Sequence, residues 1–416
     1  IKPHKIKPCC VEVPGSKSCT HRVLIAAALA DGVSRIKNAL ISEDTRYTIK
    51  ALRQMGVQIA VNDTDVRVEG RGGRLESCDA PIDLGNSGTS MRLLTGVAAL
   101  GEGTYTLTGN ARMQKRPIQD LLDALQQINV QARSVKGNGC PPVEVTGAKI
   151  NTKQVEINCQ NSSQYLSALL LMAPLTPRGL NIQVVGGPVS KPYIDLTVAL
   201  MERFGIALDR NNYQKFSIPR GQSYRAGQYA VEADCSQAAY FWSAAAIGGT
   251  RIKVMGVNSD SLQGDVHFID LLEQMGCRVS REIDGIAVIG GPLKAIEADL
   301  ADMPDQVPTL AVVAAFSQGT TVIKNVAHLK SKESDRLGAT VAGLNKMGIE
   351  ASCTKSTLTI RGGQPQGAVV ETYNDHRIAM SFAIAGLKVP GIRIRNENCV
   401  EKSFPTFWQV FEGLYQ

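Results

Sequence analysis

Six short polar motifs carry the residues of this chain whose types could do chemistry. Each is rich in Ser, Thr, Asn or Asp and stands directly ahead of a strongly apolar segment. Such residues are common helix N-caps, so a capped helix start is the simplest interpretation of any one motif. Six motifs in register also predict a shared binding site. They are GSKSCTHR (15–22), GNSGTSMR (85–92), NSSQY (161–165), DCSQ (234–237), DMPDQVPT (302–309) and NDHR (374–377).

Basic residues inside these motifs indicate an anionic ligand. Lys17, Arg22, Arg92 and Arg377 fall within the first turns of the predicted helices. A cation at that end opposes the helix macrodipole at a cost of about 0.3–1 kcal/mol. The free N–H groups of a helix N-terminus also bind anions. We therefore expect a bound polyanion to compensate the cations.

Basic loops add further cations, and acids are interleaved with them. Asp305, Glu333 and Asp375 are candidates for general acid–base catalysis, although acids that only balance neighbouring cations would give the same pattern. The five histidines lack metal-ligand spacing. The GxxxxGK[ST] and GxSxG motifs of nucleotide enzymes and hydrolases are absent. The loop cations are Arg112, Lys115, Arg116, Lys330, Lys332, Arg336 and Lys402.

A sixfold repeat must position these motifs. A glycine that ends a small-residue helix and opens a β-branched strand recurs at intervals of 70 to 76 residues, at Gly32, Gly103, Gly179, Gly249, Gly319 and Gly391. A second marker, such as LRQMGV at Leu52, keeps the same spacing in five copies. Each repeat therefore predicts a helix, a strand, a second helix and a further strand.

The first helix of each repeat is apolar around nearly its whole circumference, which predicts that protein surrounds it and that the sheets lie outside. A solenoid or a closed ring is an alternative arrangement of repeats. A polar crossing near 225–233 favours two domains. We predict one domain over 16–230 and another over 1–15 and 231–416, with the active site in the cleft between them.

Composition narrows the class of protein. The chain has 416 residues, of which 44% are hydrophobic and 20% charged, as in globular enzymes. Apolar stretches such as 166–174 are shorter than the roughly 20 residues that span a bilayer. Ten scattered cysteines predict reduced thiols. We expect a cytoplasmic monomer that binds neither membrane nor nucleic acid, and the net charge of +7 fits an acidic metabolite.

Eight motifs in order give a resemblance over nearly the whole chain. PGSKSCTHR, LGNSGTSMR, RMQKRPI, SSQYLSALL, SKPYID, KESDRL, NDHRIAM and EKSFP together resemble the 5-enolpyruvylshikimate-3-phosphate synthase family. The resemblance implies a two-domain, inside-out α/β barrel of the enolpyruvyl transferase type, with six βαβαββ repeats and three repeats in each domain. It also implies the substrates phosphoenolpyruvate and shikimate 3-phosphate, with no cofactor and no metal.

The resemblance assigns two sets of ligand-binding residues. Shikimate 3-phosphate would be held by Lys17, Ser18, Arg22, Ser162, Ser163, Gln164, Ser190, Tyr193, Asp305, His328 and Lys332. Phosphoenolpyruvate would be held by Lys17, Asn86, Gly88, Arg116, Gln164, Arg336, His376, Arg377 and Lys402. Arginine forks suit carboxylate and phosphate, and a glycine lets backbone approach a ligand.

The implied reaction adds the shikimate 5-hydroxyl to C2 of phosphoenolpyruvate and then eliminates phosphate. Asp305 would take the hydroxyl proton, while Glu333 and Lys17 are alternative donors to the methylene carbon. Two positions depart from the family pattern. His328 stands where an Asn is expected, and Leu93 stands where many relatives have Pro.

Two rival functions remain to be compared. The UDP-N-acetylglucosamine enolpyruvyl transferases share the predicted fold, but their mobile loop carries a reactive Cys and the matching loop ARMQKRPIQD has none. A ring that encircles nucleic acid would need helices basic along a face, whereas these helices are basic only at their starts.

Overall fold

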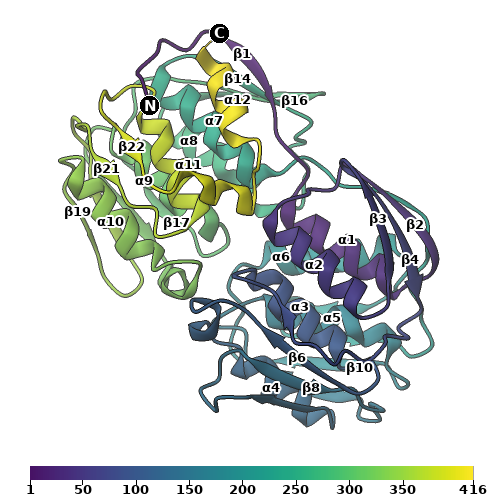
Figure 1. Cartoon of the computed structure of the whole chain (residues 1–416). Helices are drawn as coiled ribbons and strands as arrows, with labels where there is room; N and C mark the ends of the chain where they lie inside the picture. Colours follow the sequence, from purple (N-terminus) through teal and green to yellow (C-terminus); the bar gives the residue numbers. More distant parts are fainter. Residues whose placement is uncertain (416) are drawn as a thin grey trace. The chain divides into compact units, whose positions relative to one another are not determined.

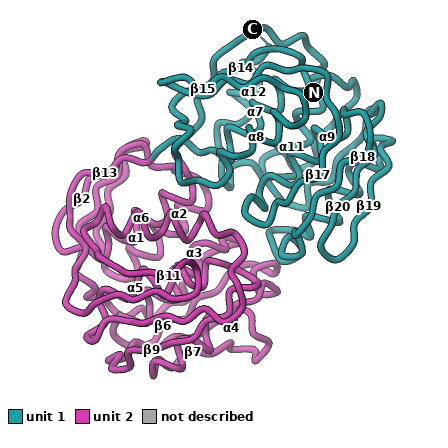
Figure 2. Tube along the Cα trace, turned by 180° about the vertical axis from the view of Figure 1, so that it is seen from behind, with its two compact units in different colours: residues 1–14, 232–416 teal, residues 15–231 magenta. Residues whose placement is uncertain are grey.

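The computed structural model describes residues 1–415, and their packing divides the chain into two compact units (Figures 1 and 2). Unit 2 comprises residues 15–231. Unit 1 comprises residues 1–14 together with 232–416. The chain therefore begins in unit 1, builds all of unit 2 and then returns to unit 1.

The sheets of unit 2 share one strand order, in which a parallel pair is followed by two antiparallel pairings. Ile182 lies opposite Val155 on one side and Phe216 on the other, and all three side chains are buried. Their chain neighbours are more exposed, as expected for sheets with one face against the core. The sheets are β13(Gln228–Ala230)-β2(Asp31–Lys37)-β4(Asp65–Arg71)-β3(Gln58–Asn62), β5(Ile82–Asp83)-β6(Thr104–Thr108)-β8(Val143–Thr146)-β7(Gln131–Ser134) and β9(Gln154–Ile157)-β10(Leu180–Val184)-β12(Lys215–Ile218)-β11(Asp209–Asn211).

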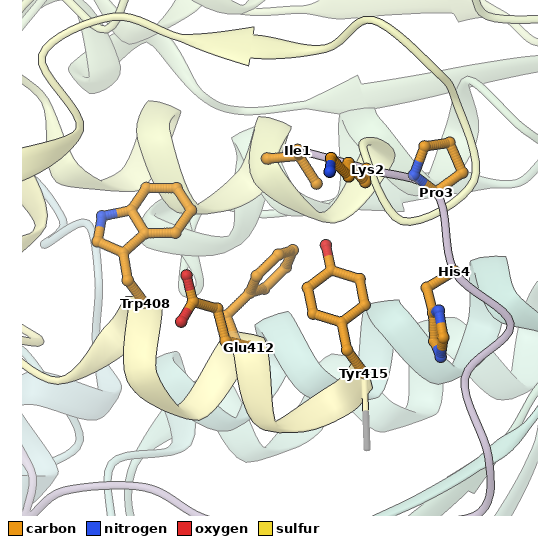
Figure 3. A pocket seen from close by; sticks show the side chains of 8 residues that line it. Ile1, Lys2, Pro3, His4, Trp408, Glu412 and Tyr415 are labelled. Carbon is orange, nitrogen blue, oxygen red and sulfur yellow. The ribbon is translucent and has the colours of Figure 1, made fainter.

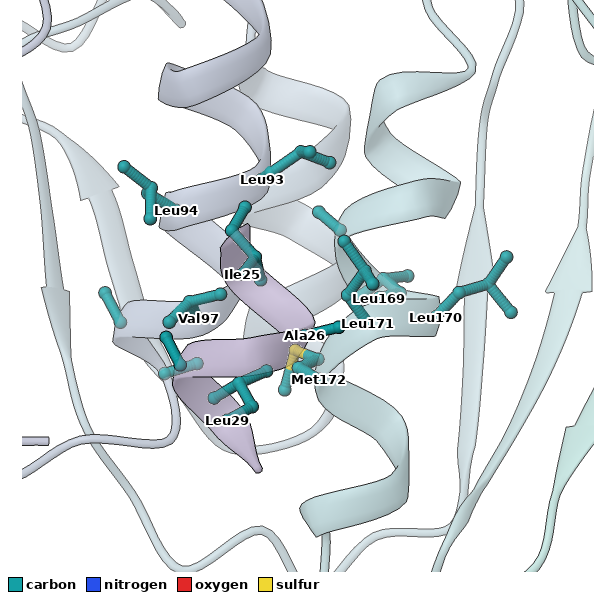
Figure 4. Close-up of a cluster of buried hydrophobic side chains, with 14 of the residues drawn as sticks. Ile25, Ala26, Leu29, Leu93, Leu94, Val97, Leu169, Leu170, Leu171 and Met172 are labelled. Atoms are coloured by element: carbon teal, nitrogen blue, oxygen red, sulfur yellow. The ribbon is translucent and has the colours of Figure 1, made fainter. Parts of the chain in front are cut away.

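Three helices of unit 2 are buried on all sides: α1 (Lys17–Leu29), α3 (Gly88–Ala98) and α5 (Gln164–Met172). Figure 4 shows their side chains in one apolar cluster that includes Leu29, Val97 and Met172. Burial of one such side chain stabilises the fold by about 1.5–3 kcal/mol. The other helices of unit 2 are α2 (Glu43–Gln54), α4 (Gln119–Gln127) and α6 (Pro192–Arg203).

Unit 1 repeats this arrangement with α7 (Cys235–Gly248), α9 (Val307–Ala314) and α11 (His376–Ala385) buried at its centre. The N-terminal strand completes one of its sheets, because Cys9 pairs in parallel with Ile252. The four-stranded sheets are β1(Cys9–Glu12)-β14(Arg251–Met255)-β16(Gly285–Ile289)-β15(Arg278–Glu282) and β17(Glu297–Asp299)-β18(Thr320–Lys324)-β20(Leu358–Arg361)-β19(Ala351–Cys353).

The last sheet of unit 1 is smaller than the others. Strand β21 (Val369–Val370) pairs only with β22 (Arg393–Ile394) among the described residues. The strand that follows Gly391 thus leads into the 3₁₀ turn η6 (Glu397–Lys402) rather than a helix and a further strand pair. This agrees with the sequence, where the second repeat marker has no sixth copy. The remaining helices are α8 (Phe268–Gln274), α10 (Arg336–Lys346) and α12 (Phe407–Glu412).

No helix within residues 1–415 combines the length and the apolar character needed to cross a bilayer.

Candidate active site

The polar motifs lie at helix starts, as their residue types predict. Ser16 caps α1 by accepting from the Cys19 N–H, and Ser87 caps α3 in the same way. Asp234 and Asp375 cap α7 and α11. The NSSQY and DMPDQVPT motifs differ, because the N-cap residues of α5 and α9 make no side-chain cap, and a 3₁₀ turn, η4 (Pro304–Gln306), precedes α9. Asp305 is therefore not bound as a helix cap.

In unit 2, the first turn of α1 presents a buried ion pair. Lys17 Nζ lies 3.2 Å from Asp44 Oδ2 in the first turn of α2. Both side chains are nearly inaccessible to solvent. Taking an ammonium and a carboxylate out of water is costly unless they are paired, so the pairing fixes the position of the Lys17 ammonium.

One turn further along α1, Arg22 is fully buried and makes its hydrogen bonds to neutral oxygens. Its Nε donates to Thr197 Oγ1 at 2.7 Å, and its terminal nitrogens donate to the carbonyls of Ser18 at 2.9 Å and Tyr193 at 3.2 Å. Within residues 1–415 no carboxylate forms an ion pair with it. Burial lowers the pKa of Arg22 to about 10, so the group is still a cation at neutral pH.

Two further arginines lie against the start of α3. Arg116 donates to the backbone and side-chain oxygens of Asn86 at 3.0 and 3.1 Å. Arg92 donates to the Gly88 carbonyl at 3.2 Å. A Cβ on Gly88 would lie 2.4 Å from one nitrogen of Arg116 and 2.6 Å from one of Arg92. The missing side chain therefore lets two guanidinium groups approach this helix start. Their approach explains the glycine at position 88 more directly than access of a ligand alone.

The start of α5 is joined to that of α3. Gln164 Nε2 donates to Thr89 Oγ1 at 3.1 Å, and the Gln164 N–H donates to Ser162 Oγ at 3.2 Å. Ser163 is buried at the same helix start. Ser190, just ahead of α6, is also buried and adopts a left-handed backbone with φ 57°. Unit 2 thus brings together hydroxyls, an amide and cations from α1, α3, α5 and α6.

Unit 1 holds its arginines in a different way. Arg336 Nε donates to Asp375 Oδ2 at 2.8 Å, and its terminal nitrogens donate to Asp305 and Glu333, each at 2.7 Å. Burial alone would lower the pKa of Arg336, but the charges of Asp375, Glu333 and Asp305 outweigh burial and raise it. Arg336 is therefore a cation held by three carboxylates.

Asp305 joins this cluster to a second arginine. Its Oδ2 accepts from Arg377 at 3.0 Å, and Arg377 also donates to Tyr240 Oη at 3.1 Å. Two guanidinium groups thus fix the carboxylate, whose side chain keeps 20% of its surface exposed. Arg336 and Arg377 are nearly inaccessible by comparison. Asp305 is oriented and still open at one edge, which suits a general base.

Four other residues of unit 1 are predicted to bind substrate. His328 is buried in η5 (Ala327–Ser331), and burial together with the charge of Lys332 lowers its pKa to about 3, so the imidazole is neutral. His376 is fully buried, with Nδ1 3.9 Å from Asp375. Lys402 is buried at the end of η6. Lys332 directly follows η5.

Sequence reasoning missed a carboxylate and a phenol at this place. Burial and the charge of Asp305 raise the pKa of Asp265 to about 6. The Ser236 hydroxyl donates to the Asp265 carboxyl group. Tyr240 contacts Arg377 from α7. No local signal marks either residue, because Asp265 lies in a turn outside the six motifs and Tyr240 lies within an apolar helix.

A groove of about 650 Å³ in unit 1 is lined by none of the predicted site residues. The chain termini form it, with Lys2, His4, Trp408, Phe411 and Tyr415 among its lining residues (Figure 3). Trp408, Phe411 and Tyr415 supply its aromatic side chains. Across residues 1–415 no group of three or more His, Cys, Asp or Glu side chains is placed to hold a metal ion.

Comparisons with known proteins agree with the motifs. The family described as EPSP synthase (3-phosphoshikimate 1-carboxyvinyltransferase) matches residues 4–411. The 3-phosphoshikimate 1-carboxyvinyltransferase of Syntrophobacter fumaroxidans is 42% identical over 97% of this chain and 96% of its own length. That of Nitrosomonas europaea is also 42% identical, over 97% and 95%.

Solved structures give the same result. The EPSP synthase of Acinetobacter baumannii superposes with a TM-score of 0.83 at 30% identity, covering all of this chain and 97% of that one. The enolpyruvyl transferase NikO of Streptomyces tendae has a TM-score of 0.79 at 21% identity, covering 99% and 96%, and shares the α/β fold.

Proposed function

The chain belongs to the EPSP synthase family, the 3-phosphoshikimate 1-carboxyvinyltransferases, and on that premise we propose how its own residues perform the transfer. The enolpyruvyl group of phosphoenolpyruvate passes to the 5-hydroxyl of shikimate 3-phosphate, and phosphate is released. The observation that supports this most directly is Arg22, a buried cation whose partners are neutral oxygens. Such a group favours an anionic ligand, and both substrates carry phosphate and carboxylate groups.

The proposed binding residues form one set for each substrate. Shikimate 3-phosphate is held by Lys17, Ser18, Arg22, Ser162, Ser163, Gln164, Ser190 and Tyr193 of unit 2 and by Asp305, His328 and Lys332 of unit 1. Phosphoenolpyruvate is held by Lys17, Asn86, Gly88, Arg116 and Gln164 of unit 2 and by Arg336, His376, Arg377 and Lys402 of unit 1. Planar guanidinium groups match carboxylate and phosphate oxygens in pairs, and serine hydroxyls at helix starts suit phosphate.

The reaction proceeds by addition and elimination. The 5-hydroxyl oxygen attacks C2 of phosphoenolpyruvate while Asp305 takes its proton, and C3 gains a proton to become a methyl group. The resulting tetrahedral intermediate then loses phosphate from C2 and a proton from C3, which restores the double bond. Positioned cations stabilise the negative charge that develops.

Two residues are alternative donors to C3. Glu333 is held by Arg336, whereas Lys17 is held by Asp44. Deuterium exchange into the methylene group of phosphoenolpyruvate, followed by NMR, separates them. Glu333→Gln abolishes exchange if Glu333 is the donor, and leaves exchange in place if Lys17 is the donor.

The substrate sets draw on both units, so we propose that the units correspond to two domains that close on their ligands. Small-angle scattering should show a smaller radius of gyration with both substrates than without them. We also propose an inside-out α/β barrel of six βαβαββ repeats, three in each domain. The common strand order of the sheets and the buried α1, α3, α5, α7, α9 and α11 support this.

A phosphate-release assay tests the activity itself. Phosphate should appear from phosphoenolpyruvate only when shikimate 3-phosphate is present. Equal or faster release with UDP-N-acetylglucosamine would instead favour the rival enolpyruvyl transferase.

A further inference from the structure

A buried chain of hydrogen bonds links three helices of unit 2. His21 Nδ1 lies 2.8 Å from Thr48 Oγ1, which lies 2.8 Å from Ser90 Oγ. Ser90 Oγ lies 2.6 Å from Ser87 Oγ. These four residues, which we call the α1–α3 relay, have no solvent-exposed surface. They come from α1, α2, α3 and the N-cap of α3.

Both ends of the relay lie next to groups proposed to bind phosphoenolpyruvate. Ser87 precedes Gly88 directly and accepts the Ser90 N–H, so it sets the geometry of the α3 start. His21 lies one helical turn beyond Lys17 on α1. Ser90 Oγ also donates to the Asp44 carbonyl at 3.3 Å, and the Asp44 carboxylate pairs with Lys17. The relay therefore ties the start of α3 to the Lys17–Asp44 pair.

Packing alone does not require this polar chain. Valine has nearly the shape of threonine and would fill position 48 without a hydroxyl to satisfy. Instead, the Thr48 hydroxyl is the link shared by His21 and Ser90, so its loss breaks both contacts. A buried polar group left without its hydrogen-bond partner costs about 1–3 kcal/mol of unfolding free energy. The complete α1–α3 relay therefore has a single preferred arrangement of hydrogen bonds.

We propose that His21 and Thr48 are positioning residues for the phosphoenolpyruvate half of the site, acting through Ser90 and Ser87 on the start of α3. The inference rests on the proposed function, because it takes Asn86 and Gly88, at the start of α3, as ligands of phosphoenolpyruvate alone. Arg22 is anchored elsewhere, by Thr197 and the Tyr193 carbonyl. Disruption of the relay should therefore weaken use of phosphoenolpyruvate and leave use of shikimate 3-phosphate nearly unchanged.

The test compares Thr48→Val with two controls. Thr48→Ser keeps the hydroxyl, and Thr95→Val removes a buried hydroxyl from α3 that donates to its own helix at Met91. We expect Thr48→Val to raise KM for phosphoenolpyruvate about three- to tenfold, as for loss of a hydrogen bond. KM for shikimate 3-phosphate should stay within about twofold, and both controls should resemble the parent in both constants.

Several outcomes would overturn the inference. One is an unchanged KM for phosphoenolpyruvate in a folded, active Thr48→Val enzyme, and another is an equal rise in both KM values. A Thr95→Val enzyme that shifts as much as Thr48→Val would also overturn it. Should Thr48→Val not fold, Ser90→Ala breaks the relay at its next link and carries the same expectation. If the parent enzyme releases no phosphate, the proposed function is wrong as well. If the parent is active and the Thr48→Val variant is unaffected, only the role of the relay is wrong.

Discussion

The two units bury their arginines in opposite electrostatic surroundings. In unit 2, Arg22 is held by hydroxyl and carbonyl oxygens, and burial lowers its pKa to about 10. In unit 1, Arg336 is surrounded by Asp375, Glu333 and Asp305, which raise its pKa despite burial. The first guanidinium keeps a positive charge without a carboxylate beside it, whereas the second forms ion pairs with three carboxylates, one of which it shares with Arg377.

This difference separates two tasks. A buried cation with neutral partners attracts an anionic ligand, which would supply the missing counter-charge. An arginine shared among carboxylates instead fixes the orientation of those acids. We infer that unit 2 contributes Arg22 as a cation for a substrate anion, and that unit 1 adds oriented acids for proton transfer to its own share of the binding residues. Four changes test this division, beginning with the largest expected effect.

Asp305→Asn should remove the proposed general base from unit 1. We expect kcat to fall by about 10²–10⁴, as for loss of a positioned proton-transfer group. Steady-state kinetics measures this, with circular dichroism to show that the fold survives. Asp270→Asn is the matched control, because Asp270 makes exposed ion pairs with Arg281 and His267 in the same unit. An Asp305→Asn enzyme with more than half of the parent kcat would exclude the role.

Arg336→Met should leave the fully buried Asp375 without its main cation. Removal of one partner from a buried ion pair costs about 3–5 kcal/mol of unfolding free energy. Arg22→Met should cost less, because Thr197 and Ser167 can still bond each other at 2.9 Å. Urea denaturation of both variants measures the contrast. Equal losses would show that the two surroundings are energetically alike.

His328 should make the stability of unit 1 depend on pH. Its pKa is about 3 in the folded protein and about 6.5 when unfolded, so only the unfolded state gains a proton between these values. Stability is therefore lost as pH falls below 6.5, by about 2 kcal/mol between pH 7 and pH 5. His328→Asn should lose less than the parent over the same interval in urea titrations. Parallel pH profiles would contradict the buried neutral imidazole.

Gly88→Ala tests how closely unit 2 packs its cations. The new methyl group meets Arg116 and Arg92, so both guanidinium groups must shift. We expect inhibition by the phosphonate glyphosate, which is longer than phosphoenolpyruvate, to weaken at least about tenfold, or 1.4 kcal/mol, with a smaller rise in KM for phosphoenolpyruvate. Gly187→Ala is the control, because a Cβ there meets nothing within 4 Å. Parallel losses of both constants would point to a turn requirement only.

Local rules in the sequence predicted the helix starts better than the contacts between them. Ser16, Ser87, Asp234 and Asp375 cap helices because short polar side chains satisfy free N–H groups there. The resemblance named Asp305, Arg336 and Arg377 but not their mutual hydrogen bonds, which join residues up to 72 positions apart. No sequence motif marks Asp265, because its raised pKa comes from burial and from the charge of Asp305, which lies far from it in the sequence.

Strand β1 has a consequence for how the protein is made. Cys9 pairs with Ile252, so the strand leaves the ribosome about 240 residues before its partner, a wait of roughly 12–50 s at ordinary elongation rates. All of unit 2 is synthesised during that wait and can fold first, since its residues are continuous from 15 to 231. Unit 2 is therefore complete before most of unit 1 has been synthesised. Strand β1 leaves the ribosome first but can pair only after β14 has been made.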